Sequence, residues 1–442
     1  MSEFPRMESS EYEVRFTNRT MTSMGGLVLF KKFLDKLRFQ EELAKWGLPK
    51  QYSGRGYAPE QLIEQFLVSI WAGANRFAHC DTIRFDSVIT NVFGWEKVAE
   101  HKAIQRIFSK VDSLNEANKL SDNIYRWVLQ SINYQGLTLD FDSTVITRYG
   151  DQEGSALGYN PKAHGRHSHH PLIAFLSSVK IVANFWLRSG NSGADNNFTN
   201  FLSDTLNKFR AGQISVVRAD SGFWSKENID FIRQKGLSYV ISVKLKESVK
   251  RAIIESKSPW KIISSGIEIK SFTYTSKTWT EPQRMIAIRR HKSLGQKAIG
   301  KQLKLFEAED LNEDWRYSVI TSNIPIEDVD IWELYRKRAN CENQIKELKY
   351  DFGLDKFSMK NFWPTETAIN FCILAYNLMT MFRLFVMRVR NAPTRSTVER
   401  KYLLSPGLWS ETADINGKPI LWLSVKHRLR PSFVSMWQTM GP

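Results

Sequence analysis

The sequence predicts a mixed α/β protein with a helical N-terminal region and a β-rich insertion. Over the first 130 residues, apolar side chains recur every three to four positions, as in amphipathic helices. From Gly136 onward, short β-branched and aromatic runs alternate with helical segments, which is typical of a layered α/β core. Between about 245 and 316, alternating polar and apolar residues interrupt this order. At 442 residues the chain is too long for one ordinary core, so several domains are expected.

The expected elements divide the chain into five parts. The N-terminal part, 1–130, contains helices over 25–37, 58–74, 102–111 and 120–132 and is expected to bind DNA. A first half of the core, 131–244, contains strands over 137–146, 170–179, 182–190, 214–222 and 238–245 and helices over 196–209 and 225–236. The insertion, 245–316, contains strands over 267–279, 283–291 and 301–310. The second half of the core, 317–390, opens with a strand over 315–323 and contains one long helix over 326–354 and an apolar helix over 367–389. The last part, 391–442, predicts no definite element.

Composition limits the classes of function. An excess of 62 Lys and Arg over 46 Asp and Glu gives a net charge of +16, which favours a polyanionic partner, foremost nucleic acid, over a merely soluble basic protein. No apolar run is long enough for a membrane span and the N-terminus lacks the centre of a signal peptide, so a cytoplasmic protein is expected. The cysteines Cys80, Cys341 and Cys372 show no C-x-x-C spacing and predict buried thiols.

Three acidic residues stand where a metal site could form. Asp142 ends the first core strand, on the same face as Asp140 because side chains alternate along a strand. Asp220 ends the fourth strand, just before a glycine-containing turn. With Glu342 of the long helix, these acids would supply oxygen ligands for a pair of Mg²⁺ ions. Taken singly, each is better explained as a turn residue or a solvated helix charge. Together they favour a metal site.

The long helix carries a further pattern on one face. At about 100° per residue, four of its side chains point within roughly 60° of one another: Tyr335, Arg338, Glu342 and Lys349. Acids that bind metal also repel a polyanion, so Arg338 and Lys349 are expected to hold flanking phosphates. Tyr335 would donate its hydroxyl group or stack on a base. The adjacent face, with Leu334, Ile345 and Leu348, would seat the helix on the sheet.

The segments containing these acids resemble the DDE transposases of bacterial insertion sequences, and the motif Tyr-x2-Arg-x3-Glu-x6-Lys resembles one branch of that group. The likeness covers about residues 20 to 390 and includes "GGLVLF" near the N-terminus, "DSTV", "ADSGF" and the β-rich insertion. It implies an RNase H-like core of the retroviral integrase superfamily. Ser221 follows Asp220 where some relatives carry arginine, so DNA contacts beside that acid cannot be transferred.

The resemblance implies a specific activity. Asp142, Asp220 and Glu342 would bind two Mg²⁺ ions, with Mn²⁺ as a possible substitute, and catalyse DNA cleavage and strand transfer. The partners would be double-stranded DNA, first the terminal inverted repeats of the element and then target DNA. A homodimer in the active complex is the simplest way to pair two ends, and the protein would associate with the nucleoid. Two alternatives remain: a structure-selective nuclease of the same fold, and a DNA-binding protein that has lost catalysis.

Other residues predict DNA contacts outside the motif. Lys162 and Arg166 lie in a basic loop between the first two core strands and are expected to touch DNA. Trp279 in the insertion is expected to stack on an unpaired or flipped base, or else to pack within the insertion. The same basic loop contains His164, His167, His169 and His170. A zinc site there is disfavoured, because no cysteine or carboxylate with matching spacing accompanies the histidines.

Overall fold

A computed structural model describes most of the chain, which folds into two compact units. The described residues are 7–8, 13–14, 17–50, 56–276, 279, 281–292, 314–388, 393–411 and 417–441. One unit comprises residues 1–107 and 381–442, and the other comprises 108–380. This division differs from the expected five parts, because helix α6 (Leu114–Gln130) belongs to the second unit and the C-terminal part belongs with the N-terminal part.

The first unit joins the two ends of the chain. Its α-helices are α1 (Val28–Lys36), α2 (Phe39–Leu43), α3 (Pro59–Trp71), α4 (Ser87–Phe93), α13 (Arg395–Val398), α14 (Arg430–Thr439) and most of α5 (His101–Ser109). A small sheet has the order β17-β16-β3, from Ile420–Leu423, Gly407–Ser410 and Met21–Thr22. A two-stranded ribbon pairs β1 (Met7–Glu8) with β2 (Glu13–Val14). In the "GGLVLF" opening, a Cβ on Gly26 would lie 1.8 Å from the Tyr402 carbonyl oxygen. The glycine is therefore required where these segments meet.

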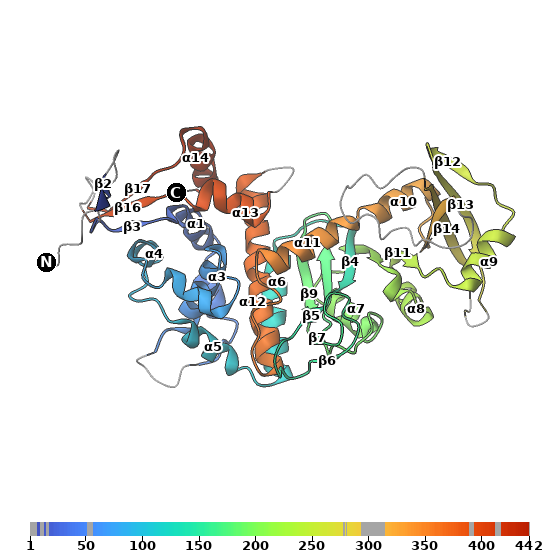
Figure 1. Ribbon diagram of the computed structural model, residues 1–442, viewed down its shortest axis with the longest axis horizontal. Coiled ribbons are helices and arrows are strands. Elements are labelled where there is room, and N and C mark those ends of the chain that lie inside the picture. Colours follow the sequence, from blue (N-terminus) through green and yellow to red (C-terminus); the bar gives the residue numbers. More distant parts are fainter. Residues whose placement is uncertain are drawn as a thin grey trace. The chain divides into compact units, whose positions relative to one another are not determined.

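The second unit is built on a nine-stranded mixed sheet, counted over the described residues, with the order β12-β13-β14-β15-β11-β10-β4-β8-β9 (Figure 1). Its strands are β4 (Leu137–Ser143), β8 (Leu172–Leu176), β9 (Ile181–Trp186), β10 (Ile214–Ala219), β11 (Ser238–Val243), β12 (Lys261–Ser264), β13 (Ile267–Tyr274), β14 (Gln283–His291) and β15 (Trp315–Ser322). Strands β8 and β9 are antiparallel to their neighbours, whereas β4, β10 and β11 are mutually parallel. This arrangement confirms the mixed α/β fold class.

The insertion extends the central sheet. Strand β14 pairs with β15 along its length, and β13 and β12 follow outward. Helix α9 (Glu247–Glu255) packs on β13 through Val249 and Ile253. The strand expected over 301–310 lies outside the described residues.

Helices cover both faces of the sheet. On one face, Phe141 of β4 makes edge contacts with Phe198 and Phe201 of α7 (Phe198–Leu206), and α8 (Lys226–Gln234) packs on β11. Helix α12 (Phe362–Met381) is joined to β9 by Asn377, whose side chain bonds both backbone groups of Val182 at 2.9 Å. In the described chain, one segment, Phe362–Met387, is apolar and long enough to span a membrane, and 89% of its apolar window is buried. That burial is typical of a core helix.

The helix expected over 326–354 is two helices. Helix α10 (Asp328–Arg336) packs on β11 and β13, and α11 (Ala339–Tyr350) follows after a turn at Lys337 and Arg338. At the turn, the Arg338 N–H donates to the Tyr335 carbonyl three residues back, 2.9 Å away, in place of the i→i−4 bond of an α-helix. The two helices follow one another in Figure 1. The single helix expected over 326–354 is therefore divided at Lys337 and Arg338.

Candidate functional site

The parallel register of β4 and β10 brings two of the predicted acids together. Ala219 of β10 lies beside Phe141 of β4, so the next residues, Asp220 and Asp142, are neighbours at the carboxyl ends of the two strands. Asp142 is buried and its Oδ1 accepts the Ser143 N–H at 2.8 Å. Asp220 Oδ1 accepts the Gly222 N–H at 2.8 Å, which caps a short 3-10 turn and fixes the carboxylate.

One guanidinium nitrogen faces both aspartates. Arg338 Nη2 lies 3.0 Å from Asp142 Oδ2 and 3.7 Å from Asp220 Oδ2. The arginine side chain is 8% exposed, and its Nε and Nη2 donate no hydrogen bond of good geometry to any described residue. The structure therefore places a cationic group between the two acids. It does not place Arg338 on a surface beside them.

Glu342 completes the group from the first turn of α11. Its side chain is half-buried, and its charge helps to raise the pKa of Asp142. Burial is the main cause of that shift, which takes the pKa of Asp142 to about 6; Arg338 opposes it, and Asp220 and Glu342 add to it. Acids that repel one another across so short a space are charged only if cations offset them.

The donor set fits a hard divalent cation. Both aspartates already share one cationic nitrogen, and carboxylate oxygens are the ligands that Mg²⁺ prefers. As the side chains stand, no three Asp, Glu, His or Cys groups among the described residues lie close enough together to hold a metal ion. A metal would require Arg338 to withdraw and Glu342 to approach.

The other two residues of the helix motif have different surroundings. Lys349, in the last turn of α11, donates from Nζ to the Val145 carbonyl at 2.7 Å, just past the end of β4. Tyr335 is only 6% exposed and packs in an apolar cluster with Val240, Ile320 and Ile331. Burial raises the pKa of its hydroxyl group. Tyr335 is therefore part of the core, and its expected contact with DNA stays a prediction.

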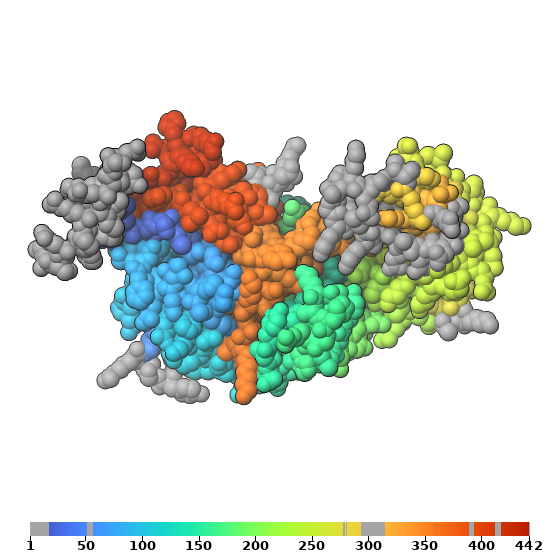
Figure 2. Space-filling model, in the orientation of Figure 1, coloured from blue at the N-terminus to red at the C-terminus, as the bar shows by residue number. Residues whose placement is uncertain are grey.

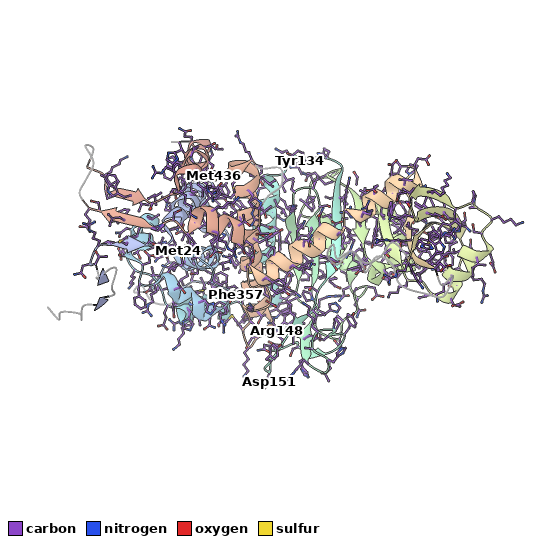
Figure 3. All side chains as sticks on the ribbon, turned by 45° about the horizontal axis from the view of Figure 1, so that its top comes forward. Met24, Tyr134, Arg148, Asp151, Phe357 and Met436 are labelled. Carbon is purple, nitrogen blue, oxygen red and sulfur yellow. The ribbon has the colours of Figure 1, made fainter. Side chains whose placement is uncertain are left out.

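The loop predicted to contact DNA lies at the surface. Lys162 and Arg166 are exposed, and the Arg166 guanidinium lies 5.9 Å from the ring centre of Tyr149, itself 81% exposed. The loop connects β6 (Ala156–Leu157) to β7 (His167–His169), which form a small sheet with β5 (Ile146–Thr147). Figure 2 shows the segment that contains this sheet in green on the visible face. Figure 3 labels Arg148, which is buried, and Asp151, which is exposed, in the same segment.

The four histidines of this loop do not form a metal site within the described chain. His169 Nδ1 accepts from Arg148 Nε at 2.9 Å, so its Nε2 donates to the Glu153 carbonyl at 3.0 Å, and burial lowers the pKa of His169 to about 4. His170 has different hydrogen-bond partners: its Nδ1 lies 2.8 Å from the Ser192 carbonyl oxygen, and its Nε2 lies 3.1 Å from Ser143 Oγ.

Trp279 lies beside another tryptophan. Its ring centre is 5.6 Å from that of Trp224, four residues after Asp220, and Lys246 Nζ stands 5.8 Å from the Trp224 ring. Trp279 is half-buried. Packing against Trp224 thus accounts for part of its surface.

A second charged layer, which the sequence did not predict, lies beneath the acids. Two residues before Asp142 and Asp220 on their strands, Asp140 and Arg218 form a buried bidentate ion pair at 2.6 and 2.7 Å. Alternation along a strand places Asp140 on the same face as Asp142 and Arg218 on the same face as Asp220. The parallel register then joins the two.

Two comparisons with known proteins gave a match, and a third gave none. A family model described as transposase DDE domain, group 1, matches residues 4–401. Among solved structures, the chain is similar to a cryo-EM structure of the piggyBac transposase synaptic complex with hairpin DNA, with 14% identity, coverage of 88% of this chain and 82% of that one, and a TM-score of 0.46. No curated protein matches the sequence.

Proposed function

Since the chain belongs to the transposase DDE domain group 1 family, we propose that it binds the terminal inverted repeats of its own insertion sequence and catalyses cleavage and strand transfer there. One observation carries the proposal: Asp142 and Asp220, brought together by the parallel register of their strands, share one cationic nitrogen at the start of the helix that bears Glu342. The bacterial origin of the element is part of the proposal.

The chemistry proposed uses carboxylates as ligands for two Mg²⁺ ions, with Mn²⁺ as a substitute. Asp142, Asp220 and Glu342 would hold the ions. When bound, the ions would activate an oxygen nucleophile. They would also stabilise the negative charge that develops on the phosphate and on the leaving oxygen. Arg338 is the group best placed to pass from the carboxylates to a phosphate oxygen, because two of its nitrogens donate no hydrogen bond within the described residues.

Positive charge supports a DNA partner. The net charge of +16 suits a polyanion, and Lys162 and Arg166 stand exposed on the loop between β4 and β8. Lys349 is held at the end of β4 by the Val145 carbonyl and would keep that loop in place beside the DNA. We further propose a homodimer in the active complex, since two ends must be paired, acting on the nucleoid in the cytoplasm.

The experiment uses linear DNA carrying the sequences that flank the gene, with Mg²⁺ and a supercoiled target plasmid. Wild-type protein should cut at the ends and join them to the target, whereas alanine at Asp142, Asp220 or Glu342 should abolish both steps and leave end binding largely intact, because phosphate contacts supply most of the affinity. Cleavage without joining would identify a nuclease. Binding without cleavage would identify a protein that has lost catalysis.

A further inference from the structure

Arg218 is a buried cation two residues before Asp220. It lies on β10 beside Asp140 of β4, and its side chain is 1% exposed. Nε and Nη2 donate to the two carboxylate oxygens of Asp140 at 2.6 and 2.7 Å. A bidentate pair of this kind compensates both charges, which makes their burial tolerable.

The same guanidinium reaches two more elements. Nη2 also donates to Ser177 Oγ at 2.6 Å, in the turn between β8 and β9, and Nη1 donates to the Leu334 carbonyl of α10. In an uninterrupted helix that carbonyl would accept the Arg338 N–H, four residues on. Here the Arg338 N–H donates to Tyr335 instead. Arg218 Nη1 thus donates to the Leu334 carbonyl in place of the Arg338 N–H.

The helix turn sets the course of α11 over the acids. Arg338 stands at the turn, with Nη2 facing Asp142 and Asp220, and Glu342 lies about one helical turn further on. Arg218 is on the strand that leads to Asp220, and its ion-pair partner is on the strand that carries Asp142. One planar, rigid group therefore connects both aspartate strands to the helix with the third acid.

We propose that Arg218 is a positioning residue for the acid site, fixing the turn between α10 and α11 and so the approach of Glu342 to the two aspartates. Its effect on metal use rests on the proposed function, whereas its effect on the helix does not. Lysine at this position keeps the charge next to Asp140 but lacks the fork that reaches Leu334 at the same time. The bond to the helix is then lost while the ion pair is retained.

The test compares Arg218→Lys with two matched controls in the full-length protein. Ser177→Ala removes another partner of the same guanidinium and leaves the helix bond. Lys208→Met removes a different buried cation, whose partners Asp122 and Asp204 lie on α6 and α7. The double variant Arg218→Met with Asp140→Leu replaces the pair by apolar side chains, an exchange that buried ion pairs commonly tolerate, and supplies a second variant without the helix bond.

Two measurements are made on each variant: hydrogen exchange of the amides in 334–345, and the Mg²⁺ concentration for half-maximal cleavage of end DNA. Both Arg218 variants should speed exchange in this segment about tenfold, as expected for loss of one charge-assisted hydrogen bond, and raise the Mg²⁺ requirement. Both controls should stay near wild type.

Unchanged exchange in both Arg218 variants, or an equal increase in Lys208→Met, would overturn the proposal. A wild-type protein that never cleaves DNA would contradict the proposed function instead. In that case faster exchange over 334–345 in the Arg218 variants would still support the positioning role of Arg218.

Discussion

Arg338 is the single residue whose surroundings differ most from the sequence-based expectation. It was expected to hold a phosphate beside the metals, and the structure places its Nη2 between Asp142 and Asp220. A guanidinium there offsets the mutual repulsion of the two carboxylates. It also competes with a divalent ion for the same oxygens, so Arg338 and the metal should exclude one another.

Arginine and glutamate variants should therefore shift metal use in opposite directions. In Arg338→Ala, the competing charge is gone, so half-maximal Mg²⁺ binding, measured by calorimetry, should occur at a lower concentration while DNA cleavage slows. In Glu342→Gln, a ligand charge is lost and Mg²⁺ binding should weaken. Weaker Mg²⁺ binding in Arg338→Ala would mean that the arginine supports the metal site and does not compete with it.

Glu366 of α12 provides a pH-dependent test of stability. It is buried, accepts the Leu187 N–H at 2.8 Å, and has its pKa raised from 4.5 to about 7 by burial. The folded state thus favours the protonated form, so stability is fully present below pH 4.5 and falls as the pH rises through 7, by on the order of 3 kcal/mol.

Glu366→Gln should remove that pH dependence, because the amide oxygen can still accept from Leu187 and carries no charge. Urea unfolding at pH 5 and pH 8 should show the variant gaining stability relative to wild type at the higher pH. The exposed Glu255→Gln serves as the control. Parallel curves for Glu366→Gln and wild type would show that the Glu366 carboxylate is not the source of the pH dependence.

Among the elements, the strands with the aspartates were predictable and the helix turn was not. Runs of β-branched residues ending in an acid predicted β4 and β10 closely. Between Glu327 and Tyr350 there is no glycine or proline, so local sequence favours one helix. The turn at Lys337 and Arg338 is instead stabilised by tertiary contacts, from Arg218 to Leu334 and from Arg338 to the acids.

In the insertion, too, local sequence predicted the strands but not their tertiary partners. Alternation predicted β13 and β14 but could not reveal that β14 pairs with β15 and enlarges the central sheet, because pairing depends on partners distant in sequence. The C-terminal strands were missed for a related reason: β16 is short and is held between β17 and β3.

Helix α11 offers an internal comparison between two lysines. Lys349 Nζ bonds the Val145 carbonyl beyond β4, so Lys349→Ala should release the loop after Asp142 and slow single-turnover cleavage, by up to about a hundredfold if the scissile phosphate is misplaced. Lys346→Ala, one turn earlier, should have a smaller effect. Equal losses in the two variants would argue against a specific role for Lys349.

For the whole molecule, charge predicts how binding responds to salt. With a net +16, affinity for end DNA should fall steeply with ionic strength, with a log–log slope of several units, as bound counterions are released. Removing the exposed Lys162 and Arg166 together should reduce the slope by about two, since each phosphate contact contributes about one. Asp142→Ala should leave the slope unchanged. A flat salt response in the wild type would contradict DNA as the partner.

If the carboxylates at the ends of β4 and β10 bind the catalytic metal, as we propose, Asp220→Cys should change which metal ion supports cleavage. The Asp220 side chain is 40% exposed, so the exchange disturbs little packing. A thiolate binds Mg²⁺ poorly and softer ions such as Mn²⁺ better. The variant should fail to cleave end DNA in Mg²⁺ and recover cleavage in Mn²⁺. Full cleavage in Mg²⁺ would contradict a metal-binding role for Asp220.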